Sequence, residues 1–506
     1  MSPQHRKGLW WKWPGIARRT VLKLAGATML VPSLGRAAEQ GANTAAAAEL
    51  WPSPFAVKIV WGYAGKHSVV AGESFDVMLS TGPDHRHASG RLEFFRIGFH
   101  PEGGRKLVWT SAPVEVESRP VPRGAAATGA AWPATLRDID TSGWPPGYYS
   151  AEFVHAETGV RDLQVLQVVV RNPRRDGRVL LKLSTNTYQA YNRWGGHSLY
   201  PTEEPSQRGN VVSFDRPTPP AFFEYEVYLA RWLEALGREA GFMVDYATDF
   251  DVHSDPTLVT DYPLVLSGSH DEYWTKEAFD AFEQRIYRLG RNVIFFGADT
   301  AYFQVRYADL DRPHDGDHRG RQLVCYKSLD DPVARRRGAT DPMLLVTARF
   351  RDGERRPESM LVGVAYQNWF PPDDDKVRFA YVVESTDAPF FTGTGYKPGD
   401  VAADVVGYEW DNRDPAGDGR RLWDRDRSKI APLPAERIKV LFRGAPVGVD
   451  GKPGRAEAVY FESPAGAKVF STGSIRWAWG LGKPGFEREP FKRFNANVVR
   501  YLLPAG

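Results

Sequence analysis

The segment "SGSHDEYW", residues 267–274, places a histidine, two carboxylates and a phenol side by side. It follows the apolar run "YPLVL" and precedes "TKEAFDAFEQRIYRLG", which has the apolar spacing of a helix. His270 and Glu272 are two residues apart, so in extended backbone both side chains point to the same side. Glu272 could then bind a hard cation while His270 faces a substrate. A packed turn, with Glu272 stabilised by the dipole of the following helix, fits the same residues.

The sequence lacks the residues that several other catalytic mechanisms need. Ser269 has no glycine two positions after it, as a nucleophile elbow requires. Cys325, the single cysteine, lies in "QLVCYKSL" beyond a charged loop, and it also rules out an intrachain disulfide framework. The sequence contains no Walker A, GxGxxG or HExxH motif. Oxygen and nitrogen ligands for a metal remain, with carboxylates that move protons.

The elements around this segment predict an α/β domain over residues 178–504. The runs "GRVLLKLS", "MVDYAT", "YPLVLSG" and "RNVIFFG" read as strands, and residues 221–241 and 275–289 as helices. This alternation predicts a mostly parallel sheet with both faces covered. Ligands gather at the C-terminal edge of such sheets, where the loops "TNTYQAYNRWGG", "SHDEYW" and "ADTAYFQVR" begin. After about residue 340 strands and loops dominate, and a last helix is expected near 488–502.

Residues 55–172 have a different texture, with short strands separated by Gly, Pro and Ser turns. This pattern predicts an all-β sandwich domain, followed by the linker "RNPRRDG". The apolar content of 42% and the 16 tryptophans are ample for real cores. The net charge of +3, without a long Lys/Arg block, predicts no nucleic-acid partner. The predicted class is therefore a multidomain α+β protein.

The N-terminus carries the features of an export signal. Arg18 and Arg19, followed by Thr20, Val21 and Leu22, resemble a twin-arginine signal. The apolar stretch near residues 24–34 is too short to cross a bilayer core of about 30 Å. We therefore predict a signal peptide over residues 1–40, an Ala-rich linker over 41–54, no membrane span, and a periplasmic or secreted location.

Five motifs, in order along the chain, resemble the large (beta) subunit of N,N-dimethylformamidase, especially its C-terminal domain. They are "LSTNTYQAYNRWGGHSLY", "VSFDRP", "LVLSGSHDEYW", "VGYEWD" and "VFSTGSIRWAWGLG". The resemblance spans roughly residues 55–500 and is densest from 178 to 306. It implies an immunoglobulin-like sandwich followed by a glutamine-amidotransferase-like α/β domain. It also implies a mononuclear iron, Fe(III), held by two tyrosines and one glutamate, that hydrolyses an amide bond.

The resemblance assigns roles to particular residues of this chain. Tyr191 and Glu272 correspond to two iron ligands, and Tyr149 of "SGWPPGYYSAEF" to the third, with the adjacent Tyr148 as the alternative. His270 corresponds to the active-site histidine and Glu409 to the second catalytic glutamate. Trp194 and Phe303 are expected either as apolar walls of the substrate site or as packing residues.

The resulting hypothesis is an exported, iron-dependent hydrolase that cleaves the C–N bond of a small amide. Dimethylformamidase works with a small partner subunit, which this chain does not contain, and the predicted export signal is a further departure. The particular amide, the need for a partner subunit and homo-oligomerisation therefore stay open. Two alternatives are a non-catalytic binding protein that keeps the fold and a hydrolase with Ser269 as nucleophile.

Overall fold

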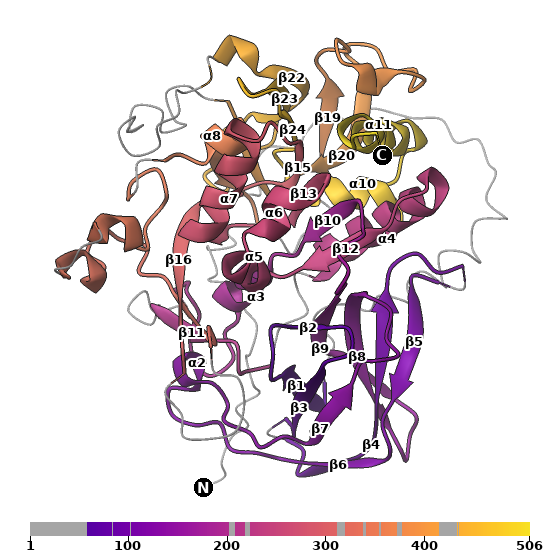
Figure 1. Cartoon of the computed structure of the whole chain (residues 1–506), viewed down its shortest axis with the longest axis vertical. Helices are drawn as coiled ribbons and strands as arrows, with labels where there is room; N and C mark the ends of the chain where they lie inside the picture. The colour runs from indigo at the N-terminus through magenta and orange to yellow at the C-terminus, as the bar shows by residue number, and fades with distance from the viewer. Residues whose placement is uncertain are drawn as a thin grey trace, which may run out of the picture.

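The computed structural model describes most of the chain after residue 57. The described ranges are 58–82, 84–101, 103–201, 208–217, 223–310, 319–336, 341–353, 356–371, 377–413, 433 and 435–505. The predicted signal peptide over 1–40 and the linker over 41–54 lie outside these ranges. Figure 1 shows two parts, with strands β1–β9 at the lower end and the helix-covered sheet above them.

The first part consists of two facing antiparallel sheets. One holds β1 (Val60–Ala64), β3 (Ser74–Thr81) and β7 (Leu136–Asp140). The other holds β2 (Ser68–Val70), β9 (Arg161–Arg171), β8 (Gly147–His155), β4 (His87–Ile97) and β5 (Arg105–Thr110), and β6 (Val114–Glu117) pairs with β4; only β2 and β9 pair in parallel. The short helix α2 (Ala125–Thr128) follows β6. Alternating apolar residues such as Val77 and Phe94 fill the space between the sheets.

The largest sheet within the described ranges has nine strands. In order they are β12 (Val244–Ala247), β10 (Val179–Lys182), β13 (Leu264–Ser269), β15 (Val293–Gly297), β24 (Lys468–Ser471), β23 (Ala456–Glu462), β22 (Lys439–Gly444), β19 (Phe379–Val383) and β20 (Val401–Val406). Strands from β12 to β24 run parallel, and those from β24 to β20 are antiparallel. The prediction of a mostly parallel sheet was therefore right for only about half of it. The chain is an α+β protein, as predicted.

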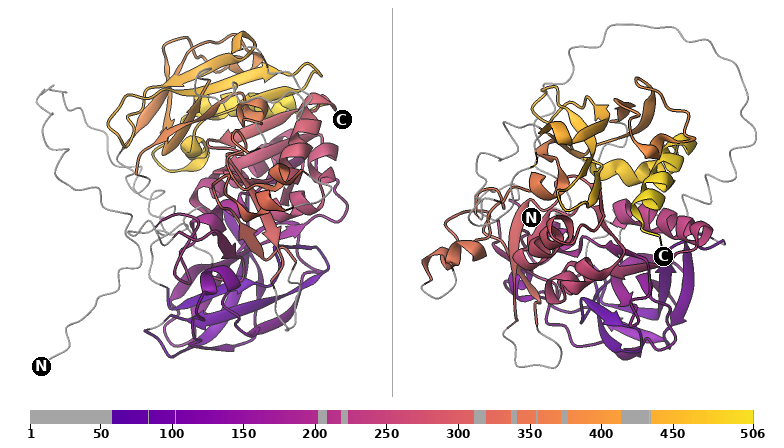
Figure 2. Two further views of the ribbon diagram at one scale, coloured as in Figure 1. Left: turned by 90° about the vertical axis from the view of Figure 1, so that its left-hand side faces the viewer. Right: turned by 45° about the horizontal axis from the view of Figure 1, so that its top comes forward.

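Helices cover both faces of this sheet, as the alternating apolar pattern requires. Leu180 and Val265 pack with α5 (Asp249–Ser254), α6 (Thr257–Asp261) and α7 (Lys276–Tyr287). Their neighbours Leu181 and Leu266 pack on the other face with α4 (Phe223–Ala240), α10 (Trp479–Gly482) and α11 (Glu489–Leu502). The predicted helices over 221–241, 275–289 and 488–502 correspond to α4, α7 and α11. Figure 2 shows these helices between the N-terminal strands and the strands nearest the C-terminus.

Smaller elements complete the C-terminal edge of the parallel strands. A four-stranded sheet joins β11 (Val211–Ser213), β17 (Gln322–Val324), β16 (Phe303–Ala308) and β14 (Tyr273–Thr275), and β18 (Ala365–Trp369) pairs with β21 (Glu409–Asn412). The segment "TNTYQAYNRWGG", predicted as a loop, begins with the short helix α3 (Thr185–Tyr191), and α8 (Ser359–Val362) precedes β18. Short 3-10 helices lie at Pro332–Arg335, Pro342–Leu345, Pro389–Phe391, Ala435–Arg437 and Ile475–Ala478. None of the helices in the described ranges combines the length and the apolar character needed to cross a membrane.

A fully buried lysine lies at the end of strand β10, between β12 and β13. The Lys182 ammonium forms ion pairs with Asp249 and with Asp271, whose two carboxylate oxygens lie 2.7 and 2.8 Å away. Burial lowers the pKa of Lys182, but the two carboxylates outweigh burial and raise it above its usual value. The lysine therefore stays charged and fixes Asp271 within "SGSHDEYW".

Replacing this lysine should destabilise the protein strongly. Lys182→Met leaves two buried carboxylates without their counter-charge, and we expect a loss of about 3–5 kcal/mol in the free energy of unfolding. Urea denaturation followed by tryptophan fluorescence measures this loss. Lys276→Met is the control, because its partly exposed i,i+4 pair with Asp280 should contribute less than about 1 kcal/mol. Equal losses in the two variants would contradict a structural role for the buried pair.

Candidate metal and catalytic site

The candidate site lies where the parallel strands end. His270 and Glu272 follow β13, Asp299 follows β15, and Tyr191 is the last residue of α3 after β10. Glu409 comes from the other direction, as the first residue of β21. The two strand ends approach closely at Gly297, where a Cβ atom would lie 1.9 Å from the carbonyl oxygen of Ser269. A larger residue at 297 would separate the loops that carry the site.

The backbone around the site adopts conformations that non-glycine residues rarely use. Ser269, Asp299 and Ala301 have positive φ angles of 44°, 53° and 56°. Each such residue costs on the order of 1–3 kcal/mol, and such strain concentrates at functional sites. Here it turns the chain sharply just after β13 and β15, so that polar side chains replace the apolar ones of the strands.

Hydrogen bonds on both sides hold the loop at residues 270–272. The Glu272 amide donates to the Thr187 hydroxyl at 3.2 Å, and its carbonyl accepts from the amides of Tyr302 and Phe303 at 3.0 Å each. The Asp271 side chain points away toward Lys182 and Ser267. The side chains of His270 and Glu272 lie together, with Nε2 and Oε2 3.3 Å apart. The period-two alternation expected from the sequence is thus observed.

Two phenols converge on the Glu272 carboxylate. The Tyr191 hydroxyl lies 3.0 Å from Oε2, the Tyr200 hydroxyl lies 2.5 Å from Oε1, and the two phenol oxygens are 2.9 Å apart. Burial and the nearby Glu272 carboxylate raise the pKa of both phenols well above the usual value. Ionising them therefore needs a compensating cation. Two phenolates and a carboxylate form the hard oxygen set that suits Fe(III), so these residues fit an iron ion.

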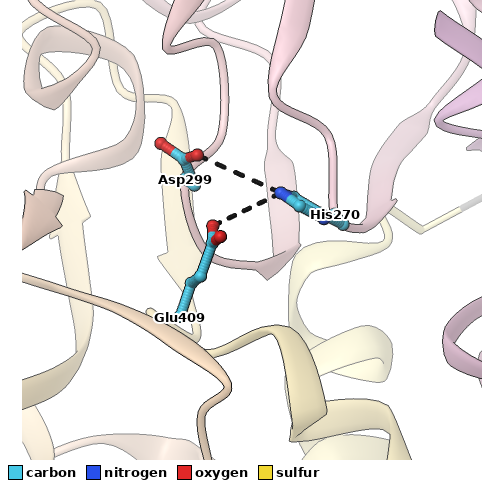
Figure 3. A group of neighbouring side chains, drawn as sticks. All are labelled: His270, Asp299 and Glu409. Atoms are coloured by element: carbon cyan, nitrogen blue, oxygen red, sulfur yellow. Dashed lines mark ion pairs between the residues drawn. The ribbon is translucent and has the colours of Figure 1, made fainter. Parts of the chain in front are cut away.

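A histidine–carboxylate group lies beside this oxygen cluster (Figure 3). His270 Nε2 is 3.3 Å from Glu409 Oε2 and 4.0 Å from Asp299 Oδ2. Its Nδ1 is 2.9 Å from the Tyr408 hydroxyl. Burial lowers the pKa of His270, but the Glu409 and Glu272 carboxylates outweigh burial and raise it to about 9. The imidazole is therefore held as a buried cation that can donate a proton.

Asp299 brings a third carboxyl group to the same place. Burial and the charges of Glu272, Glu409 and Asp411 raise the pKa of Asp299 well above its usual range. Burial and the crowding of carboxylates thus disfavour the ionised form of Asp299. One ligand atom from each of His270, Asp299 and Glu409 lies within 4.8 Å of the others, so this group is a second candidate for holding a metal ion.

The structure does not bring all the predicted residues together. Tyr149 lies in the core between the two N-terminal sheets, and its hydroxyl donates to the Pro145 carbonyl. Tyr148 faces the other way and packs in the core that includes α4. The Tyr149 hydroxyl is thus engaged within the N-terminal part, whereas the hydroxyls of Tyr191 and Tyr200 lie on Glu272. The assignment of Tyr149 as an iron ligand stays a prediction, and Tyr200 takes that position in this geometry.

The two residues predicted as apolar walls, Phe303 and Trp194, lie in different parts of the structure. Phe303 stacks on Tyr273 with ring centres 5.7 Å apart, next to the oxygen cluster. Trp194 instead packs edge-on against Trp132, at 5.4 Å, in a small cluster by the N-terminal sheets. The Ser269 hydroxyl is buried and has no hydrogen-bond partner among the described residues. It therefore lacks the adjacent base that a serine nucleophile needs.

Four residues at the site were not assigned a role from the sequence: Tyr200, Asp299, Lys327 and Tyr408. Three of them lie in motifs that were singled out. Tyr200 ends "GGHSLY", Asp299 lies in "ADTAYFQVR", and Tyr408 precedes Glu409 in "GYEWD". Lys327 lies beyond a charged loop with no signal in its surroundings.

Fold and site together define an α+β protein with a buried tyrosine–carboxylate–histidine centre at the end of a parallel sheet. The chain belongs to the family described as N,N-dimethylformamidase beta subunit-like, C-terminal, whose model matches residues 91–490. Relatives include the N,N-dimethylformamidase beta subunits of Alcaligenes sp and Paracoccus aminophilus. Each is 25% identical over 297 residues, which cover 55% of this chain and 36% of the relative. The match thus spans only about a third of the length of these relatives.

The oxygen cluster leads to a prediction about metal binding. Tyr200→Phe removes one phenolate, so bound iron measured by elemental analysis should fall sharply with the fold intact. Tyr149→Phe tests the assignment from the resemblance. If Tyr200 is the ligand, the iron content should stay near that of the unmodified protein, because the Tyr149 hydroxyl donates to Pro145; iron lost from this variant would make Tyr149 the ligand. Asp299→Asn separates the two candidate sets. Iron lost from Asp299→Asn but kept in Tyr200→Phe would place the ion at His270, Asp299 and Glu409 instead.

Proposed function

We propose that this chain is an exported, iron-dependent hydrolase of a small amide. The observation that carries the proposal is the triangle of Tyr191, Tyr200 and Glu272 oxygens beside the His270–Glu409 pair. Family membership supports it, because the relatives are named N,N-dimethylformamidase beta subunits. Bound Fe(III) would polarise the amide carbonyl and lower the pKa of a bound water.

The neighbouring side chains can carry the protons that amide hydrolysis requires. Water adds across the C–N bond, so one proton must leave the water and one must reach the departing nitrogen. The Glu409 carboxylate is placed to take the first proton, and the buried, protonated His270 is placed to give the second. Tyr408 holds the far ring nitrogen and so orients the imidazole between the two carboxylates.

Finer features of the proposal come from the family resemblance. They are an immunoglobulin-like N-terminal sandwich, a glutamine-amidotransferase-like second domain, and a partner subunit like the one implied by the name of the relatives. The two facing sheets and the helix-covered nine-stranded sheet support the first two. Sedimentation of the protein expressed alone and with its chromosomal neighbours tests the third.

The division of roles predicts how Glu409→Gln behaves. This change keeps the shape of the side chain but removes the base, so turnover of a small amide should fall by about 100-fold or more. Iron content should stay near that of the unmodified protein, because Glu409 lies outside the oxygen cluster. Loss of iron together with activity would make Glu409 a ligand. An iron-loaded protein that binds amides without hydrolysing any of them would favour the binding-protein alternative.

Export is tested separately from chemistry. Replacing Arg18 and Arg19 by lysine should leave full-length precursor in the cytoplasm, because the twin-arginine pair is the address that the route reads. Immunoblots of cell fractions measure this. Mature protein appearing outside the cytoplasm at an unchanged level would contradict the twin-arginine assignment.

A further inference from the structure

Lys327 lies on the chain just after β17 and presents its ammonium to three aromatic rings. Nζ is 3.3 Å from the ring centre of Tyr200, 4.5 Å from that of Phe303 and 5.1 Å from that of Tyr273. Such cation–π contacts are attractive and fix the position of the ammonium. The hydroxyl of the same Tyr200 ring lies on Glu272. The ring of Tyr200 therefore separates the Lys327 ammonium from the oxygen cluster.

This ammonium differs from the other cations of the region in having no direct partner. In the described ranges Lys327 makes no hydrogen bond or ion pair, whereas Lys182 is paired with two aspartates. Arg349 and Arg351, which lie near Tyr302, are paired with Asp352 and Glu358. As a whole residue, Lys327 is partly exposed to solvent.

Among the acidic groups that act on Lys327 in the described part of the chain, Glu272 has the largest effect, ahead of Cys325 and Asp299. Burial lowers the pKa of Lys327, and the Glu272 carboxylate opposes that shift. In the proposed function, however, two phenolates and the Glu272 carboxylate neutralise a trivalent ion. The Glu272 carboxylate would then be engaged with the ion, so that a substrate carboxylate could become the direct partner of the Lys327 side chain.

We propose that Lys327 determines substrate class, selecting amides whose non-reacting end carries a carboxylate. The inference rests on the proposed function, since it concerns the same site. A carboxylate would form a charge-assisted hydrogen bond with the ammonium, and the flat faces of Tyr200 and Phe303 would contact the short chain that joins it to the amide. The neutral dimethyl substituents of dimethylformamide offer nothing to this cation.

A matched pair of formamides tests the proposal. N-formylglycine and N-formylglycinamide are nearly equal in size, but only the first is an anion at neutral pH. The protein should bind N-formylglycine about 10- to 100-fold more tightly, as a charge-assisted hydrogen bond allows. Calorimetric titration measures both affinities, and kcat/KM is measured for both compounds in parallel.

Two variants assign the preference to Lys327. In Lys327→Met, which keeps the length and the apolar contacts of the stem, the ratio of the two affinities should fall toward one. Lys327→Arg should keep a clear preference for the anion, and Lys276→Met, whose ammonium pairs with Asp280, should match the unmodified protein. Equal affinities in the unmodified protein would overturn the proposal, and so would equal weakening of both compounds by Lys327→Met. The second result is expected of a lysine that only balances Glu272.

The same measurements separate this inference from the proposed function. Hydrolysis of both compounds with equal kcat/KM would remove the selectivity role and leave the amide hydrolase intact. An anion preference that Lys327→Met abolishes, without hydrolysis of either compound, would refute the hydrolase and leave an anion-binding site.

Discussion

The buried ion pair between Lys182 and Asp271 is the interaction on which the site depends. It joins the end of β10 to the loop after β13 through a lysine with no exposure to solvent. Since neighbouring side chains of an extended segment alternate, holding Asp271 on one side forces His270 and Glu272 to the other. The ion pair between two adjacent strands thus determines the side on which the His270 imidazole and the Glu272 carboxylate lie. The cost of burying the lysine is offset by the two aspartates that surround it.

The charge distribution of the site follows from crowding acids at one sheet edge. Glu272, Glu409 and Asp299 lie within reach of one imidazole, and none of them is exposed. Such a group cannot be fully ionised without cations. At this edge the structure holds a protonated His270, an Asp299 whose ionised form is disfavoured, and the side chain of Lys327 on the ring of Tyr200. A hard metal ion at the phenol oxygens would carry the largest positive charge at the site, and it would balance the remaining negative charge.

The sequence predicted individual elements of this arrangement but not how those elements pair and meet. Strand and helix periodicity predicted the helix-covered parallel strands, and the spacing of His270 and Glu272 predicted that they share a side. The antiparallel half of the sheet was not predicted, although β22, β23 and β24 follow one another along the chain, because apolar alternation indicates a strand but not the direction in which it pairs. Tyr149 and Tyr200 illustrate the same limit. Tyr148 and Tyr149 alternate on β8 and enter two different cores, whereas Tyr200 reaches Glu272 from a loop beyond α3.

The phenols of an iron site can come from different elements of a chain. What an iron site needs from the chain is two phenols and a carboxylate at one point, and neither their order nor their secondary structure is prescribed. Glu272 is tied to β13 and cannot shift, but a phenol on a loop such as that of Tyr200 can approach from any side. Because the ring of Tyr200 also contacts the ammonium of Lys327, a phenol proposed as a metal ligand would also set the position of that ammonium. Metal binding and substrate selection would then share one side chain.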